Sequence, residues 1–221
     1  MTKNYLHCLT ETINPETTVI AFDLHNVVFK KQTKKIVASC IKLMPQGTWR
    51  YALNPVLWYR VYRFKAHSCV AEDIFHKVAA YYPGLTRFRG DFIRLTNTQR
   101  PILPVVQLLK QLKERGYKLY VLSNIGKETF TELSLKYPEI SSYFDGAFTA
   151  TAENNYTHKP HKEFYEEFKL LLATHGHHDK QILFIDDLKK NIVAATQCNI
   201  GGIHYTSARK LVSQFKHLRI F

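Results

Sequence analysis

Residues 18–23 read TVIAFD, a short run of apolar and β-branched residues that ends in a carboxylate. A run of this length and composition predicts a buried strand of a parallel sheet. The same pattern recurs at residues 118–123 (KLYVLS) and 181–187 (QILFIDD), and residues 146–150 (GAFTA) and 201–205 (GGIHY) complete the set. The sequence therefore predicts five parallel strands, three of which end in polar side chains.

Helical patterns fill the chain between the later strands. Residues 101–116 have apolar residues at helical spacing, a proline at their start and a glycine at their end, which is typical of a helix. Four more segments have the same spacing, namely 127–137, 161–175, 188–198 and 207–218. Strands that alternate with helices predict an α/β fold, a Rossmann-like parallel sheet with helices on both faces.

Polar residues stand where three of the expected strands end. They are Asp23, Ser123 and the pair Asp186 and Asp187. Ligands of such sheets bind beyond the carboxyl ends of the strands. We therefore expect these side chains to converge on one crevice.

A long segment after the first strand, residues 33–98, interrupts the alternation. Three stretches within it have helical patterns, and none has a clear strand pattern: KIVASCIKLM (35–44), NPVLWYRVYRF (54–64) and AEDIFHKVAAYY (71–82). We interpret it as an inserted α-helical cap. The expected organisation is an α/β core domain of residues 1–30 and 99–221 with a cap domain of residues 31–98.

The composition is that of a folded globular protein. Of 221 residues, 45% are hydrophobic, and only nine are Gly and eight Pro, which excludes disordered and collagen-like chains. No apolar run reaches the roughly 18 residues of a membrane span, and residues 1–20 lack a signal-peptide pattern. The four cysteines form no C-x-x-C pair, so a reducing compartment is expected. These observations favour a soluble, cytoplasmic protein.

Positive charge is concentrated in the insert. The chain carries a net charge of +13, and residues 30–100 hold 14 Lys and Arg against three acids, a net +11. Within residues 49–65, aromatic residues alternate with cations. Three interpretations remain open: core packing with arginines extending to solvent, recognition of a multiply anionic substrate, or a surface for nucleic acid or an anionic membrane.

Four motifs in chain order resemble those of the haloacid dehalogenase (HAD) superfamily. They are VIAFDLHNVVF with Asp23, LYVLSN with Ser123, HKPHKEFY with Lys159, and ILFIDDLKKN with Asp186 and Asp187. Each motif alone is common, but the four in this order, spread over residues 18–205, are specific. Most members of this superfamily are magnesium-dependent phosphatases, and many carry a cap between the first two motifs. The resemblance implies a Mg²⁺-dependent phosphohydrolase that acts on a small phosphorylated metabolite.

The resemblance also assigns roles, which agree with the chemistry. A carboxylate attacks an anionic phosphoryl group only if a metal and a cation screen the repulsion. Asp23 would be the nucleophile, forming an aspartyl-phosphate, and Lys159 the screening cation. Magnesium prefers carboxylate and carbonyl oxygens. The implied metal ligands are Asp23, Asp187, the backbone carbonyl of His25 and, through water, Asp186, while Ser123 and Asn124 would bind phosphate oxygens.

His25 departs from the pattern of the superfamily. Phosphatases of this kind usually carry a second Asp there, which serves as acid and base. Imidazole can also exchange protons near neutral pH. Three interpretations therefore stay open: a working acid/base, an enzyme that turns over slowly, or an inactive fold that only binds phosphorylated ligands.

Two alternative functions follow from that departure. One is a slow or inactive phosphate-binding protein whose basic cap docks an acidic partner. The other is a 2-haloacid dehalogenase, which lacks the second Asp but uses no metal and gains nothing from the acidic pair Asp186 and Asp187. The sequence does not specify the substrate or the oligomeric state.

Overall fold

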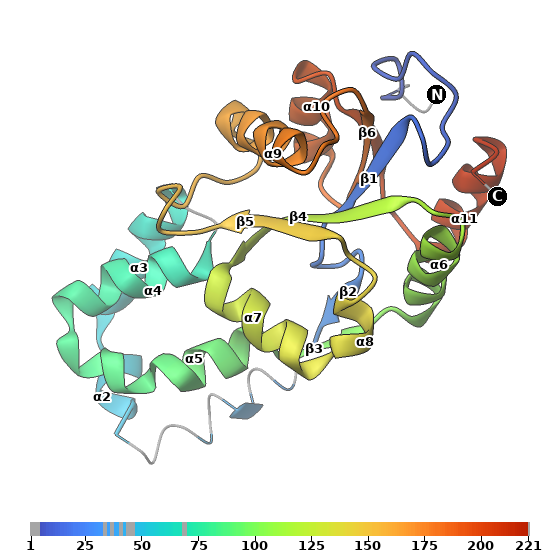
Figure 1. The fold of residues 1–221 in the computed structure, drawn as a ribbon. Coiled ribbons are helices and arrows are strands. Elements are labelled where there is room, and N and C mark those ends of the chain that lie inside the picture. The colour runs from blue at the N-terminus through green and yellow to red at the C-terminus, as the bar shows by residue number, and fades with distance from the viewer. Residues whose placement is uncertain are drawn as a thin grey trace.

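The fold is built on a five-stranded parallel sheet, seen in a computed structural model that describes residues 5–32, 35, 38–39, 42, 47–67 and 70–220 (Figure 1). The strand order is β5-β4-β1-β6-β7, and each neighbouring pair is parallel. This confirms the five predicted strands and the α/β class. Their bounds are β1 (Thr18–Phe22), β4 (Lys118–Gly126), β5 (Gly146–Ala150), β6 (Gln181–Asp186) and β7 (Gly201–His204).

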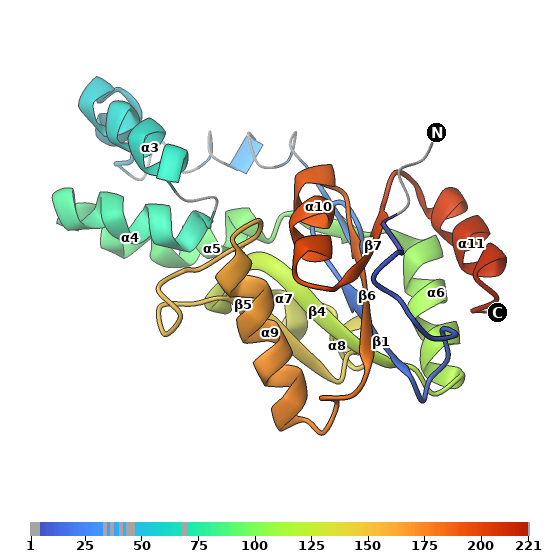
Figure 2. The ribbon, with the colours of Figure 1, turned by 90° about the horizontal axis from the view of Figure 1, so that it is seen from above.

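Helices cover both faces of the sheet (Figure 2). One face packs against α6 (Leu103–Glu114), α7 (Lys127–Lys136), α8 (Pro138–Ser141) and α11 (Ala208–His217). The other packs against α9 (Lys162–Thr174) and α10 (Lys189–Gln197). The five predicted helices are present, and the short helix α8 is an addition that four residues of sequence were too few to indicate.

The central strand β1 serves both layers of the core. Its residues alternate between the two faces, so that Ile20 and Phe22 pack in one cluster and Val19 and Ala21 in the other. Every residue of β1 is buried. This explains why β1 is an uninterrupted apolar run rather than an alternating one.

The insert after the first strand is helical throughout its described part. It contains α2 (Trp49–Ala52), α3 (Pro55–His67), α4 (Ala71–Tyr81), the 3₁₀ helix η2 (Pro83–Phe88) and α5 (Arg89–Thr96). Most of the helix expected at 35–44 lies outside the described residues. No described helix has the length and apolar character needed to cross a bilayer. The sequence pattern had not indicated α5 or η2, because Pro83, Gly84 and Gly90 interrupt the apolar spacing there.

A two-stranded antiparallel ribbon connects the insert to the core. It pairs β2 (Phe29–Lys31) with β3 (Gln99–Pro101), and Lys30 faces Arg100. We had expected no strand in this region, because three-residue strands leave no periodic pattern. The segment by which the chain leaves the core therefore lies beside the segment by which it returns.

The insert is also fixed to the first turn of α7. The buried carboxylate of Glu72 accepts a hydrogen bond from the backbone N–H of Thr129 at 2.6 Å. Arg89 forms an ion pair with Glu128, and the side-chain amide of Asn97 donates to the carbonyl of Thr129 at 3.1 Å. A carboxylate at a helix N-terminus satisfies free N–H groups and complements the helix dipole. The insert therefore supplies the cap of a core helix.

Candidate functional site

Three carboxylates meet at the carboxyl ends of β1 and β6. Residue Phe22 pairs with Ile185 across these strands, so Asp23 and Asp186 are the next residues on each. Carboxyl oxygens of Asp23, Asp186 and Asp187 all lie within 4.8 Å of one another. The predicted convergence of strand-end acids is present in the structure.

The buried side chain of Lys159 lies between two of these carboxylates. Its Nζ donates to Asp23 Oδ1 at 2.9 Å, to Asp186 Oδ2 at 2.7 Å and to the carbonyl of Leu122 at 2.7 Å. Burial alone would lower the pKa of Lys159, but the two carboxylates raise it above its ordinary value. The lysine is therefore a fixed cation beside Asp23.

Asn124 holds the backbone that carries this lysine. Its side-chain Oδ1 accepts from the N–H of Lys159 at 2.7 Å, and its Nδ2 donates to the carbonyl of Lys159 at 2.9 Å. This double contact ties the end of β4 to the loop before α9. In the structure Asn124 positions Lys159, and it also lines the cavity described below.

The two acids after β6 have different surroundings. Asp186 is fully buried and accepts hydrogen bonds from Lys159, from the Asn191 side chain and from the N–H of Leu188. Asp187 lines the cavity and accepts from Asn26 Nδ2 at 3.0 Å. Burial raises the pKa of Asp187. Asp186 thus orients the lysine, and Asp187 offers oxygen toward the cavity.

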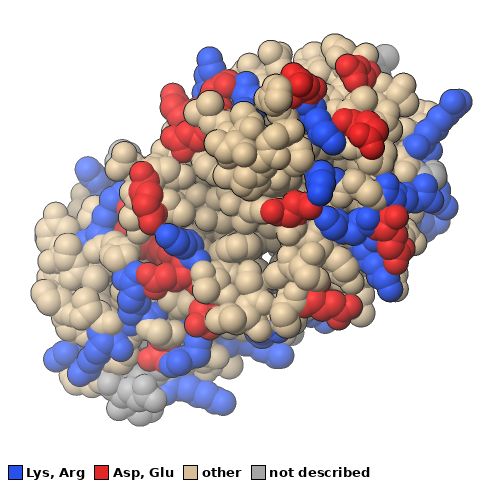
Figure 3. Space-filling model, in the orientation of Figure 1, with Lys and Arg blue, Asp and Glu red and all other residues tan. Residues whose placement is uncertain are grey.

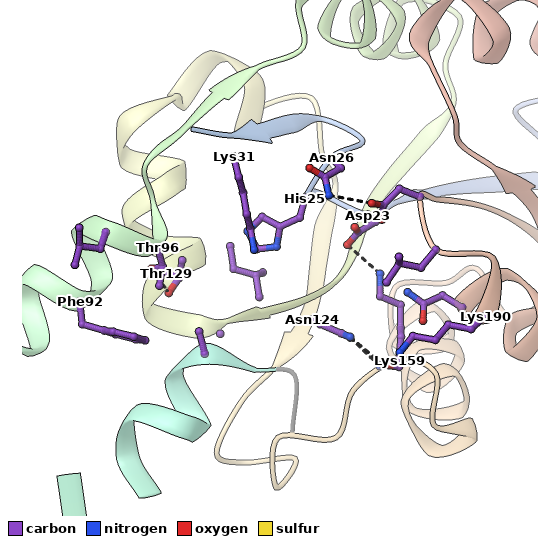
Figure 4. Close-up of a pocket in the computed structure, with 17 residues that line it drawn as sticks. Asp23, His25, Asn26, Lys31, Phe92, Thr96, Asn124, Thr129, Lys159 and Lys190 are labelled. Carbon is purple, nitrogen blue, oxygen red and sulfur yellow. Dashed lines mark hydrogen bonds and ion pairs between the residues drawn. The ribbon is translucent and has the colours of Figure 1, made fainter. Parts of the chain in front are cut away.

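A cavity of about 550 Å³ opens in front of these groups, between the core and the insert (Figure 4). This volume is within the range of small-molecule sites. In the figure Phe92 lies on the opposite side of the cavity from Asp23 and Lys159. The insert contributes mostly apolar side chains to the wall, namely Ala71, Phe92, Leu95 and Thr96, to which the core adds Ile125 and Leu188.

The side chain of His25 also lines the cavity. It lies next to Lys31 (Figure 4), and its Nε2 is buried with no hydrogen-bond partner among the described residues. Burial, together with the nearby charges of Lys31 and Lys159, lowers the pKa of His25 to about 3. The imidazole is therefore neutral here, with one free nitrogen.

Ser123 occupies a different position from the one expected. Its side chain is fully buried, its Oγ has no hydrogen-bond partner in the described part of the chain, and it is not among the residues that line the cavity. The next residue, Asn124, reaches the cavity instead.

Sequence reasoning missed several residues of the site. Asn26 and Asn191 hold the acidic pair, and Lys31 and Lys190 line the cavity. Asn191 lies five residues after Asp186 in the fourth motif, so that motif already contained it. Asn26 has a positive φ of 59°, a conformation that asparagine tolerates better than most residues, but nothing in the sequence links it to Asp187.

A comparison with protein-family models identifies the family of this chain. The haloacid dehalogenase-like hydrolase family matches residues 72–204. This range includes Lys159, Asp186 and Asp187, and Asp23 precedes it.

Relatives and solved structures agree with this match. The sesquiterpene phosphatase astK of Aspergillus oryzae is 27% identical over 199 residues, 89% of this chain and 94% of that protein. The magnesium complex of the HAD family enzyme bt-2542 from Bacteroides thetaiotaomicron has a TM-score of 0.60 and 16% identity, covering 93% of this chain and 99% of that chain.

A second structure, the L-2-haloacid dehalogenase from Xanthobacter autotrophicus, has a TM-score of 0.57 and 18% identity, covering 91% of this chain and 83% of that chain. At these identities the two structures show a shared fold. The family match covers more than half of the sequence. With its parallel sheet and the acids at the ends of β1 and β6, the chain belongs to the haloacid dehalogenase-like hydrolase family.

Proposed function

We propose that this protein is a magnesium-dependent phosphohydrolase that acts through an aspartyl-phosphate on Asp23. The observation that carries the proposal is the placement of a buried lysine and three carboxylates at one end of the cavity. An anion that attacks another anion needs such screening. A dehalogenase that attacks carbon has no use for the acidic pair.

The residues present fit a magnesium ion. Asp187 faces the cavity, and only Oδ1 of Asp23 carries a hydrogen bond to Lys159, which leaves Oδ2 of Asp23 for other contacts. Carboxylates that leave room for water and phosphate oxygens are what Mg²⁺ prefers. Asp23 and Asp187 would hold the ion directly, with the carbonyl of His25, and Asp186 would act through water. When bound, the ion neutralises negative charge on the phosphate.

The reaction follows from the positions of the chain's own groups. A carboxylate oxygen of Asp23 forms a bond to phosphorus as the bond from phosphorus to the ester oxygen breaks, and the ester oxygen leaves as an alcohol with a proton taken from water. Water then attacks the same phosphorus, which releases phosphate and restores Asp23. The Nζ of Lys159, 2.9 Å from Asp23 Oδ1 in the structure, supplies a positive charge that screens the repulsion between the attacking carboxylate and the phosphate.

Three polar atoms in the motifs have no hydrogen-bond partner among the described residues, namely His25 Nε2, Ser123 Oγ and Asn191 Oδ1. His25 Nε2 is buried against the cavity. Because the lowered pKa of His25 keeps the imidazole neutral, this nitrogen can accept the proton that the attacking water loses. Ser123 lies within β4, and its buried Oγ would have to turn toward the cavity to donate to a phosphate oxygen. We assign the role of general base to His25 on this geometry.

The cavity wall favours a phosphate ester with an apolar organic part. Phe92 and Leu95 of the insert face the space in front of Asp23, and the relative in Aspergillus oryzae is a sesquiterpene phosphatase. We assign the insert, residues 31–98, as the cap that selects the substrate. The proposed substrate class is a terpenoid-like phosphate monoester.

Phosphate release from p-nitrophenyl phosphate and from farnesyl phosphate, with and without Mg²⁺, tests the proposal. We expect turnover that needs Mg²⁺, is lost in Asp23→Asn and is unchanged in the matched surface variant Asp179→Asn, whose carboxylate is exposed. Phe92→Ala should lower kcat/KM for farnesyl phosphate about tenfold and leave p-nitrophenyl phosphate nearly unaffected. Absence of turnover in the wild type, with phosphate binding retained, would establish the inactive phosphate-binding alternative instead.

The role of His25 has its own test. We expect His25→Asn to lower kcat at least tenfold, about 1.4 kcal/mol in barrier, with little change in KM. The variant His25→Asp restores the carboxylate usual in such phosphatases and should keep more activity than His25→Asn. If His25→Asn turns over as fast as the wild type, the imidazole has no part in proton transfer.

A further inference from the structure

The outer face of α3 exposes an unusual set of side chains. Tyr62 is 72% exposed, Tyr59 60%, Trp58 55% and Val56 53%. Just before this helix, Leu53 and Trp49 are exposed to a similar extent. Exposed apolar residues scattered singly need no explanation, but a contiguous set marks an interaction surface. We call these six residues the aromatic face.

The packing of α3 shows that the aromatic face is not the side with which this helix packs against the described protein. The helix buries its opposite side, where Leu57 is buried, Arg60 lies 3.7 Å above the ring of Tyr81 and Phe64 stacks on the same ring. Residues 57, 60 and 64 follow helical spacing and face α4. The aromatic face therefore lies on the side of α3 away from α4, and α3 itself lies at the outer edge of the described insert (Figure 2).

Positive charge surrounds the aromatic face. Residues 47–67 contain Arg50, Arg60, Arg63 and Lys65 and no Asp or Glu. Arg50, Arg63 and Lys65 are exposed. On the opposite side of the insert, which faces the viewer in Figure 3, Asp and Glu lie among the Lys and Arg. The aromatic face with its cations attracts an anionic partner and also offers apolar side chains to it.

We propose that the aromatic face of α2 and α3 docks this protein on the surface of an anionic phospholipid bilayer. Tryptophan and tyrosine favour the boundary between headgroups and acyl chains. Lysine and arginine beside them are attracted to anionic lipids. No described helix spans a bilayer, so the contact is peripheral. This inference does not depend on the proposed activity.

Two other partners fit the aromatic face less well. A single-stranded nucleic acid would stack bases on the aromatic rings, but it has no use for the aliphatic side chains of Leu53 and Val56, which are 74% and 53% exposed. A second copy of the chain would bring together two copies of residues 30–100, each with a net charge of +11. A bilayer satisfies both the aliphatic groups and the charge.

The chain contains its own probe for this contact. Its only two tryptophans, Trp49 and Trp58, both belong to the aromatic face. Vesicles of phosphatidylcholine and phosphatidylserine in equal parts should shift the tryptophan emission to shorter wavelength and sediment with the protein. Vesicles of phosphatidylcholine alone should bind much less, and high salt should weaken the binding because it screens the charges.

Two double variants separate the apolar and the charged contributions. Tyr59→Ser with Tyr62→Ser keeps both tryptophans and should lower vesicle partitioning at least tenfold. Arg63→Gln with Lys65→Gln should lower it by a similar factor, since each cation contributes roughly fivefold near an anionic surface. The matched control, Lys210→Gln with Lys216→Gln on α11 at the other end of the molecule (Figure 1), removes the same charge and should bind nearly as the wild type.

Three results would overturn the proposal. In the first, the aromatic-face variants bind vesicles as tightly as the control variant. In the second, a single-stranded oligonucleotide shifts the emission and vesicles do not, which would assign the face to nucleic acid. In the third, the wild type is a dimer that the tyrosine substitutions dissociate. All four substituted side chains are exposed, so we expect each variant to fold. Circular dichroism of each variant checks this.

Discussion

Replacing Lys159 by Met tests how the site is held together. The change keeps the length of the side chain but removes a cation that is 2% exposed and donates three hydrogen bonds. It leaves Asp23 and Asp186 as two buried carboxylates with no charge between them. Removing one partner of a buried ion pair costs about 3–5 kcal/mol, a large part of the roughly 5–15 kcal/mol that stabilises a domain.

Urea unfolding in the presence of EDTA measures this loss without any contribution from a metal. We expect Lys159→Met to lower the free energy of unfolding by about 3–5 kcal/mol. The control Lys110→Met removes a lysine whose pairing with Glu114, at 3.9 Å, is solvent-exposed. That control should change the free energy by no more than about 0.5 kcal/mol.

A second substitution shows whether uncompensated charge is the cause. Asp186→Asn removes one of the two carboxylates that lose their cation. The double variant with Lys159→Met should therefore lose about 1–3 kcal/mol less than the sum of the single variants. The electrostatic explanation would be refuted if the loss of unfolding free energy in the double variant equals the sum of the two single losses within about 0.5 kcal/mol. It would also be refuted if Lys159→Met alone loses less than about 1 kcal/mol.

Three further predictions concern the insert and the metal. The hydrogen bond from Arg89 lowers the pKa of Glu128. The pair therefore stabilises the fold at pH values above the ordinary glutamate pKa, and this stabilisation is lost in acid. In thermal melts, Glu128→Gln should have a lower Tm than the wild type at pH 7, and the difference in Tm should disappear below about pH 4. A Cβ on Gly126 would collide with the carboxylate of Glu72, so Gly126→Ala should cost about 1–2 kcal/mol in urea unfolding through loss of that helix cap. Saturating Mg²⁺ should raise the Tm of the wild type by roughly 2–4 °C or more, whereas Asp187→Asn should show no such rise.

The core of the fold was predictable because its strands are buried on both faces. A strand such as β1, with all residues inside, is a continuous apolar run that the sequence displays directly. The ribbon of β2 and β3 and the helix α5 were not predictable in the same way. Three-residue strands have no periodicity, and Gly90 near the start of α5 conceals its pattern.

The charged part of the site was predictable, and its supporting contacts were not. Asp23 and Asp186 follow strands whose ends must meet in a parallel sheet, and Lys159 came from its motif. The contact of Asn26 with Asp187 joins residues 161 positions apart, which no local pattern indicates. Asn124 was expected to bind phosphate, and its two hydrogen bonds to the backbone of Lys159 are a further role that the motif did not indicate.

The β2–β3 ribbon has a consequence for how new specificities arise in this protein. Because Lys30 and Arg100 are paired neighbours, the chain enters and leaves the insert at one place in the core. A recombination event that replaces that stretch would exchange the proposed cap while leaving the proposed catalytic residues Asp23, Lys159 and Asp187 encoded elsewhere in the gene. Chemistry and choice of substrate can therefore evolve at separate rates within one polypeptide.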